Sequence, residues 1–164
     1  MILTRKQTLK WISVLILFLS VLSCKDRTVF EQQTEFSGES WEQSDIRSFS
    51  CEIEDTISSH RILLNLRHTG AYPYQNLFIF AETENPQGIV LRDTLELFFA
   101  DETGRWLGAG SGTLYAYEYP FKRNVRFPIP GKYEFRFEQA MRMKELPGIH
   151  NLGIQIERIH GNIE

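Results

Sequence analysis

The sequence predicts an all-β protein, an antiparallel β-sandwich that follows an N-terminal apolar segment and a short tether. From residue 46 onward, apolar residues recur at every second position, which is the period of half-buried strands. Turn-forming residues separate these runs at short intervals, and this spacing favours seven to nine short strands. Jelly-roll-like and immunoglobulin-like topologies both remain open, because the pattern does not define the order of the strands.

The expected strands are stripes of apolar residues of one parity. The first stripe carries Phe49, Cys51 and Ile53, and later ones fall in residues 62–66, 89–99, 115–119, 133–137 and 152–156; residues 77–80 are instead a short, fully apolar run that suits a central strand. Tight turns are expected at residues 85–88, 101–104 and 130–131, which contain Asn, Asp, Pro and Gly. Helical spacing occurs only in residues 138–146, where a short helix is expected to end before Pro147-Gly148.

The N-terminal segment has the pattern of an export signal. Three basic residues precede an apolar run that ends at Val21-Leu22-Ser23-Cys24. The run is shorter than the roughly 20 apolar residues of a membrane-spanning helix. These last four residues resemble the lipobox of bacterial lipoproteins, whose cysteine receives diacylglycerol and becomes the new N-terminus. Cys24 is therefore the predicted lipid-attachment residue. The alternatives are an ordinary secretory signal, or an uncleaved anchor, with Cys24 there by chance.

Three segments follow from this pattern: a lipoprotein signal peptide over residues 1–23, a lipidated N-terminus and polar tether over 24–45, and the sandwich domain over 46–164. One edge strand is expected inside the tether, near residues 28–33. Trp41 also lies in the tether, and we expect it to dock on the body rather than to stay exposed.

Charge and cysteine content exclude several classes of function. Residues 1–23 hold three of the 18 Lys and Arg residues and none of the 21 Asp and Glu residues, which leaves the mature chain a net charge of −6. That balance argues against a nucleic-acid partner and against electrostatic binding to anionic lipid. With Cys24 lipidated, Cys51 has no disulfide partner, and its place in an apolar stripe predicts a buried, unreactive thiol.

No constellation of residues predicts catalysis, a cofactor or a metal. The cluster of Gly104, Gly108, Gly110 and Gly112 precedes an expected strand rather than a helix, so it indicates close strand packing rather than a phosphate loop. His60 and His68 lie about 26 Å apart on an extended strand and cannot share a metal. Histidines at strand ends are expected to face solvent. We predict no catalytic, cofactor-binding or metal-binding residues and no small-molecule substrate.

Aromatic residues near turns are the best candidates for a binding surface. Tyr72, Tyr74 and Trp106 lie in or beside expected turns, and Arg67 lies close to the first two in sequence. Such rings can stack on sugars or bind a partner protein. In the commoner alternative, at least two of the three rings plug the ends of the sandwich.

Several segments together resemble the gliding-motility lipoprotein family of Bacteroidetes, the GldH type. They occur in order over about two-thirds of the mature chain: the stretch from Leu66-Arg67-His68 through Tyr72-Pro73-Tyr74 to Asn76-Leu77; Asp93-Thr94, Ala100-Asp101 and Trp106-Leu107-Gly108; and Gly131-Lys132-Tyr133, Glu138 to Arg142, Leu146-Pro147-Gly148-Ile149 and Leu152-Gly153-Ile154.

This resemblance implies a non-enzymatic cell-envelope lipoprotein that supports gliding and the associated type IX secretion machinery. It implies other gliding and secretion proteins as partners, the membrane as the site of the lipid, and no established catalytic residues. An outer-membrane, periplasm-facing position is expected, because Lys25-Asp26-Arg27 does not resemble the acidic run of surface-exported lipoproteins. The alternative function is an envelope glycan-binding module; an envelope hydrolase ranks last, because no acid/base pair converges.

Overall fold

The computed structural model describes residues 27–111 and 113–159, so the signal segment and Cys24 lie outside the described residues. The described chain consists of strands and one short 3-10 turn. The elements are β1 (Thr28–Glu35), η2 (Ser37–Glu39), β2 (Ser40–Glu42), β3 (Arg47–Ile53), β4 (His60–Thr69), β5 (Asn76–Glu84), β6 (Val90–Phe98), β7 (Ala109–Ser111), β8 (Leu114–Val125), β9 (Gly131–Gln139), β10 (Glu145–Pro147) and β11 (Ile149–Arg158). None of the described elements is a helix long and apolar enough to cross a membrane.

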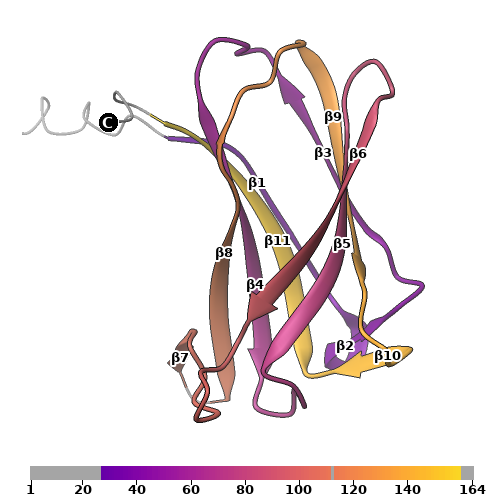
Figure 1. Cartoon of the computed structure of the whole chain (residues 1–164), viewed down its shortest axis with the longest axis vertical. Helices are drawn as coiled ribbons and strands as arrows, with labels where there is room; N and C mark the ends of the chain where they lie inside the picture. The colour runs from indigo at the N-terminus through magenta and orange to yellow at the C-terminus, as the bar shows by residue number, and fades with distance from the viewer. Residues whose placement is uncertain (1–26, 112, 160–164) are drawn as a thin grey trace, which may run out of the picture.

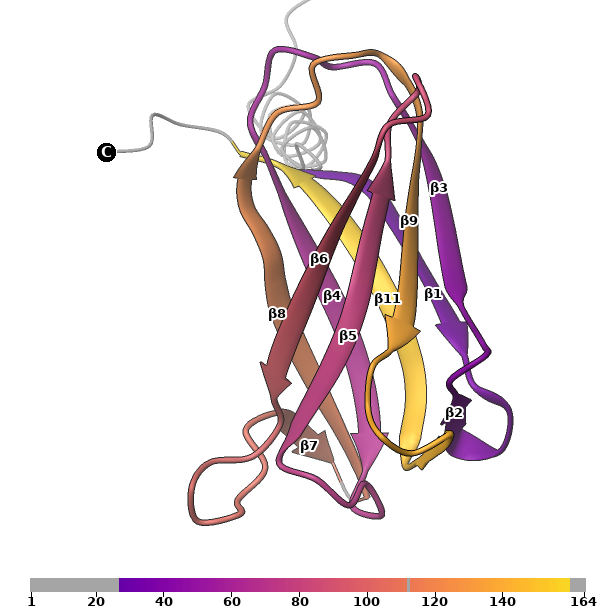
Figure 2. The same cartoon turned by 45° about the vertical axis from the view of Figure 1, so that its right-hand side comes forward.

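Two antiparallel sheets pack face to face, which confirms the predicted all-β sandwich. One sheet has the strand order β1-β11-β4-β8-β7 and the other has the order β3-β9-β5-β6. A small ladder of β2 and β10 closes one end of the molecule (Figures 1 and 2). Every strand pair in these sheets is antiparallel.

The core is formed by the residue parity that the sequence predicts. On β3, the side chains of Phe49, Cys51 and Ile53 are buried, whereas the residues between them are exposed. The other strands of both sheets supply further fully buried side chains, namely Leu64, Leu66, Leu77, Ile79, Leu97, Phe135, Phe137, Leu152, Ile154 and Ile156. Burial of each such side chain contributes about 1.5–3 kcal/mol to folding. The core is therefore large enough to hold the sheets together without a disulfide.

The domain boundary expected at residue 46 is wrong, because the folded body begins at Thr28. β1 pairs with β11 from Thr28–Glu157 to Glu35–Asn151, with one bulge, which confirms the predicted edge strand. Trp41 is fully buried, stacks on Phe36 at 4.8 Å between ring centroids, and donates its indole N–H to the Asp45 carbonyl at 2.8 Å. The boundary was missed because an edge strand exposes polar side chains and shows only weak apolar alternation.

The short helix expected over residues 138–146 does not form. β9 continues through Gln139, and the chain then bends toward β10. The fully buried Gln139 side chain holds this bend: its Oε1 accepts the Met141 N–H at 2.9 Å, and its Nε2 donates to the Met143 carbonyl at 2.8 Å. One amide side chain thus satisfies backbone groups that a helix would have paired internally.

Strand register assigns the connections to two ends of the sandwich. Thr28 lies beside Glu157, His60 beside Arg158 and Val125, and Val90 beside Glu84. The start of β1 therefore shares one end, here called the N-terminal end, with the β3–β4, β5–β6 and β8–β9 connections (upper end in Figures 1 and 2). The β4–β5 connection and the segment between β6 and β8 lie at the opposite end, here called the aromatic end.

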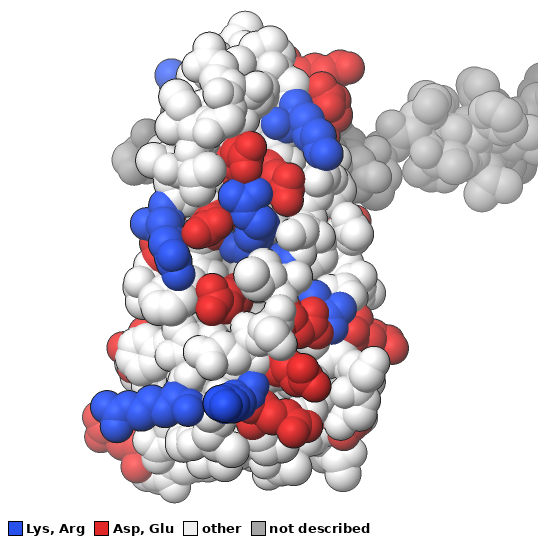
Figure 3. Space-filling model, turned by 90° about the vertical axis from the view of Figure 1, so that its right-hand side faces the viewer, with Lys and Arg blue, Asp and Glu red and all other residues white. Residues whose placement is uncertain are grey.

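Charges of both signs alternate on the outer face of the β3-β9-β5-β6 sheet. Arg136 lies among Glu82, Glu84 and Glu134, with its guanidinium 2.8 Å from Glu84 and 3.2 Å from Glu82. Figure 3 shows this mixture of blue and red over the face in view. Exposed pairs of this kind add little stability. They also leave this face without the one-sided positive field that nucleic acid requires.

Replacement of Trp41 tests whether the segment before residue 46 belongs to the fold. We expect Trp41→Ala to lower the free energy of unfolding by about 3–5 kcal/mol, because it empties a buried site and removes the stacking partner of Phe36. Urea denaturation of the purified protein measures the loss. The exposed Ile46 is the matched control, and Ile46→Ala should change stability by less than about 0.5 kcal/mol. Equal stability of Trp41→Ala and the wild type would show that this segment is a free tether.

Candidate functional site

Aromatic rings surround the buried His68 at the aromatic end. The imidazole stacks on Phe99 at 4.6 Å and on Tyr115 at 5.4 Å between ring centroids, and the edge of Trp106 meets it at 4.6 Å. His68 comes from β4, Phe99 follows β6, Tyr115 belongs to β8 and Trp106 lies in the connection to β7. The cluster therefore joins both sheets where they meet at this end.

The protonation state of His68 follows from its burial. Its side chain is fully buried, Nδ1 lies 3.1 Å from the Thr69 carbonyl, and Nε2 has no hydrogen-bond partner among the described residues. Loss of water around the ring lowers the pKa of His68, and the Thr69 contact opposes this only in part. The neutral imidazole consequently behaves as a flat ring of the core.

The expectation that His60 and His68 face solvent is wrong. Both are fully buried at opposite ends of β4, and burial lowers the pKa of each. His60 packs its edge against Phe127 at 5.3 Å, much as His68 packs against its aromatic neighbours. Both histidines have the inward parity of Ile62, Leu64 and Leu66, and that parity was the signal for burial.

Tyr72 is a core residue and not part of a binding surface, which corrects its place in the predicted site. It is 3% exposed, its hydroxyl donates to the Asn76 carbonyl at 2.7 Å, and its ring meets Phe99 edge-on at 5.2 Å. Burial raises the pKa of the Tyr72 hydroxyl. Tyr72 thus plugs the end of the sandwich and holds the β4–β5 connection in place.

Arg67 and Trp106 do not share a surface. Arg67 is exposed and has the opposite parity to His68 on β4, so it projects from the outer face of its sheet. Trp106 is half-buried and lies against His68, which has the inward parity. Tyr74 and Trp106 therefore lie at the aromatic end, whereas Arg67 projects from the outer face of the β1-β11-β4-β8-β7 sheet.

An exposed apolar patch replaces the predicted four-residue surface. Tyr74, Phe98 and Leu107 are 37%, 52% and 50% exposed. Backbone hydrogen bonds hold their segments side by side, because Phe99 donates to Gln75 at 2.7 Å and Leu107 donates to Phe99 at 2.8 Å. We call these three residues the distal patch. Sequence reasoning missed Phe98 and Leu107, although Phe98 has the outward parity between the buried Leu97 and Phe99.

The loop beside the distal patch is held by one carboxylate. The Asp101 side chain accepts the backbone N–H groups of Thr103 and Arg105 at 2.9 and 3.0 Å and the Thr103 hydroxyl at 2.6 Å. These hydrogen bonds, the Thr103 hydroxyl first, lower the pKa of Asp101 to about 2. Gly104 completes the turn with φ +82, as the predicted turn requires.

The glycines of this region allow close packing, as predicted, and do not form a phosphate cradle. A Cβ on Gly108 would lie 2.5 Å from the Ala116 carbonyl oxygen, and one on Gly110 would lie 2.8 Å from the Tyr115 ring. Strand β7 can therefore approach β8 only because these positions lack side chains.

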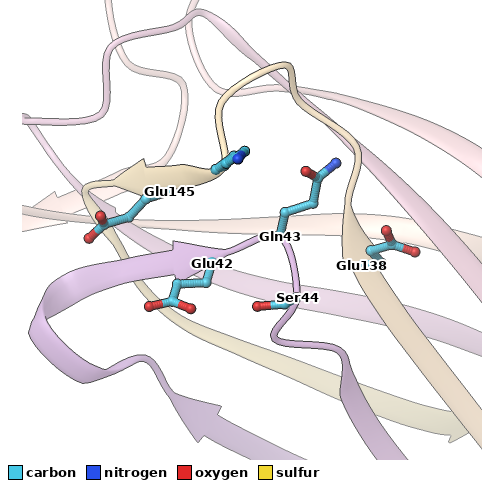
Figure 4. A pocket seen from close by; sticks show the side chains of 6 residues that line it. Glu42, Gln43, Ser44, Glu138 and Glu145 are labelled. Carbon is cyan, nitrogen blue, oxygen red and sulfur yellow. The ribbon is translucent and has the colours of Figure 1, made fainter.

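A wide polar hollow between β2, β9 and β10 has no catalytic arrangement. It encloses about 540 Å³ and is lined by Glu42, Gln43, Ser44, Glu138, Lys144 and Glu145. Figure 4 shows the Glu42 and Glu145 side chains extending toward the same side of the β2–β10 ladder, whereas Glu138 lies across the hollow, so the three carboxylates do not converge on one point. An acid/base pair needs both groups within reach of one substrate. Among residues 27–111 and 113–159, no group of His, Cys, Asp and Glu has the geometry of a metal site.

Cys51 is the inert thiol that the sequence predicts. Its side chain is buried in the core, and the loss of solvation raises the pKa of the thiol to about 11. The reactive thiolate is therefore scarce at neutral pH.

Comparison with known proteins identifies the family. A family model described as GldH lipoprotein matches residues 28–156. The chain belongs to the GldH lipoprotein family. It is 32% identical to a gliding motility lipoprotein GldH homolog from Christiangramia forsetii over 143 residues, which cover 83% of this chain and 87% of the relative. It is 29% identical to the gliding motility lipoprotein GldH of Flavobacterium johnsoniae, with 84% and 89% covered.

Solved structures resemble the chain only weakly. The carbohydrate-binding module CBM35 from Cellvibrio japonicus Abf62 aligns over 87% of this chain and 96% of its own, with 15% identity and a TM-score of 0.34. A TM-score this low carries no conclusion about binding. The GldH match covers nearly all of the described strands, β1 included, which confirms the resemblance seen in the sequence.

Two glycines with the same backbone conformation test the packing around Tyr72. Gly148 and Gly104 both have φ +82, but a Cβ on Gly148 would collide with the Tyr72 backbone, whereas one on Gly104 would meet open space. We expect Gly104→Ala to cost about 1–2 kcal/mol, the cost of a left-handed non-glycine residue. Gly148→Ala should cost more, because the Tyr72 loop must also move. Chemical denaturation measures both, and equal losses would show that the Gly148–Tyr72 contact is unimportant.

The buried histidines predict a loss of stability in mild acid. Unfolding returns each imidazole to a pKa of about 6.5, whereas burial lowers the pKa in the folded state. The unfolded chain therefore binds more protons below that pH, and the free energy of unfolding should fall as the pH drops from 7 to 5. His68→Phe should flatten this dependence in urea titrations at each pH, and His60→Phe should flatten it separately. An unchanged pH dependence in both variants would contradict the assigned burial effect.

Proposed function

We propose that this GldH-family protein is anchored by lipid on Cys24 and acts without catalysis, by binding other envelope proteins of the gliding and type IX secretion machinery through the distal patch. The family supplies the lipoprotein character and the link to gliding motility. The observation that carries the binding mode is the exposure of Tyr74, Phe98 and Leu107 on three adjacent segments.

The distal patch has the properties of a protein-binding surface. Exposed apolar side chains grouped together and surrounded by polar residues are typical of protein interaction sites. Arg105, which is strongly exposed, and Glu96, which accepts the Asn76 amide at 2.7 Å, supply polar groups close by. The Asp101 loop and the ring cluster under the patch fix its shape before a partner arrives, so binding would require little ordering of the protein.

The ring geometry does not favour the glycan-binding alternative. Sugar platforms use exposed rings that lie flat in a shared groove. Tyr72 is buried, the Tyr72 and Tyr74 rings are inclined by 74°, and the half-buried Trp106 ring packs against His68 at an interplanar angle of 61°. Only Tyr74 of these three offers a substantially exposed ring. A protein partner therefore fits the aromatic end better than a sugar does.

We assign the protein to the periplasmic face of the outer membrane. The support is the segment Lys25-Asp26-Arg27, which lacks an acidic run directly after the predicted lipidation site. Cys24 itself lies outside the described residues, and its lipidation is tested by mass spectrometry of the N-terminal peptide.

Substitutions in the distal patch test the binding mode in cells. In the native host, a strain whose only gene copy carries Tyr74→Ser, Phe98→Ser and Leu107→Ser should accumulate the protein normally. The same strain should lose surface gliding or type IX secretion, because the apolar contact is gone. Immunoblotting, colony spreading and assay of secreted proteins give the three readouts.

The matched control is Ile46→Ser with Met143→Ser, which changes exposed apolar residues outside the patch. This control should glide and secrete like the wild type. Normal gliding and secretion in the triple variant would contradict the proposed binding mode. If the control variant also loses gliding and secretion, the cause is the added polarity of the surface in general and not the loss of the distal patch.

A further inference from the structure

We infer that the N-terminal end of the sandwich lies against the lipid bilayer, so that the aromatic end points away from it. This inference rests on the proposed lipidation of Cys24. It adds two things that lipidation alone does not specify. The sandwich has a defined orientation, and its N-terminal end contacts the lipid bilayer directly.

The length of the connection leaves the body no room to stand off the membrane. Arg27 is already part of the fold, because its carbonyl accepts the Arg158 N–H at 2.8 Å. Only Lys25 and Asp26 separate it from Cys24. Three residue steps reach at most about 11 Å when fully extended. An acylated Cys24 at the bilayer interface therefore holds the start of β1 within that distance of the membrane.

The loops that share this end carry exposed aliphatic side chains. Ile57, in the β3–β4 connection, is 84% exposed, and Leu91, at the start of β6, is 66% exposed. Val29, Ile89 and Val90 are exposed at the same end. Ile89 and Leu91 also rim an opening of about 180 Å³ between the sheets, with Val125 and Phe127 in its walls. Apolar loop tips of this kind gain free energy when they enter the headgroup and acyl boundary.

A body lying on its side would bring the wrong surface to the lipid. The start of β1 lies at the edge of its sheet, so the alternative contact is the length of that edge strand. Beyond Val29, the exposed residues of β1 are Glu31, Gln32, Gln33 and Glu35. Carboxylates are repelled by anionic headgroups and are costly to remove from water. The N-terminal end also exposes Glu52 and Glu54, but it presents five exposed aliphatic side chains, whereas β1 presents none beyond Val29. End-on contact through the aliphatic loops is therefore favoured over contact through the strand.

Single cysteines allow this orientation to be measured on the full lipoprotein. Cys51 is buried and has a raised pKa, and Cys24 is acylated, so an introduced exposed cysteine is the reactive one. Ile57→Cys and Leu91→Cys place an environment-sensitive nitrobenzoxadiazole probe at the N-terminal end. Leu107→Cys places the same probe at the aromatic end and serves as the matched control. Each labelled protein is reconstituted into vesicles of phosphatidylethanolamine and phosphatidylglycerol that contain spin-labelled lipid.

The expected result is loss of emission from the probes at 57 and 91 and full emission from the probe at 107. Lipid-modified protein that floats with the vesicles but shows no quenching at 57 and 91, or equal quenching at 107, overturns the orientation alone. Absence of lipid on Cys24, read by mass spectrometry, overturns the anchoring proposal and this inference together.

Discussion

The pairing of β1 with β11 is the constraint on which the rest of the molecule depends. It adds the N-terminal strand to a sheet whose other strands come from the middle and the end of the chain. It also decides at which end of the sandwich the chain enters the fold. Because Arg27 is hydrogen-bonded to Arg158, the folded body starts almost immediately after the predicted lipidation site. With the proposed lipid on Cys24, the two ends of the sandwich would have different surroundings.

Several polar side chains of the aromatic end bond to groups within the fold. Neutral His68 lies flat between two rings, Tyr72 donates its hydroxyl to the backbone, and Asp101 holds the neighbouring loop. Desolvation of a histidine costs stability, and the contacts of the stacked rings offset that cost. The result is a preorganised platform on which Tyr74, Phe98 and Leu107 expose apolar surface. Such a platform fits the proposed recognition of a protein partner.

Alternation of apolar residues was sufficient to predict the sandwich and the buried Cys51, and the turn-forming residues predicted the main turns. It failed at β1, because this edge strand exposes mostly polar side chains and so lacks clear alternation. It also failed after β9, because the bend there depends on hydrogen bonds of the Gln139 amide, which apolar alternation does not reveal. The site was predicted only in part. Tyr74 and Trp106 do lie at the aromatic end, but parity alone already separated Arg67 from His68. The burial of Tyr72 depends on Phe99 and Gly148, which are distant in sequence, so no local pattern could reveal it.

The height of the aromatic end above the membrane tests the central claim most directly. Energy transfer from a donor on Leu107→Cys to acceptors in the lipid headgroups of vesicles measures that height for the intact lipoprotein. β4 runs from one end of the sandwich to the other in 10 residues, which span about 33 Å. An upright body therefore predicts a donor about 30 Å or more above the headgroups. A donor within about 10 Å of them, as in a body lying on its side, would contradict this account.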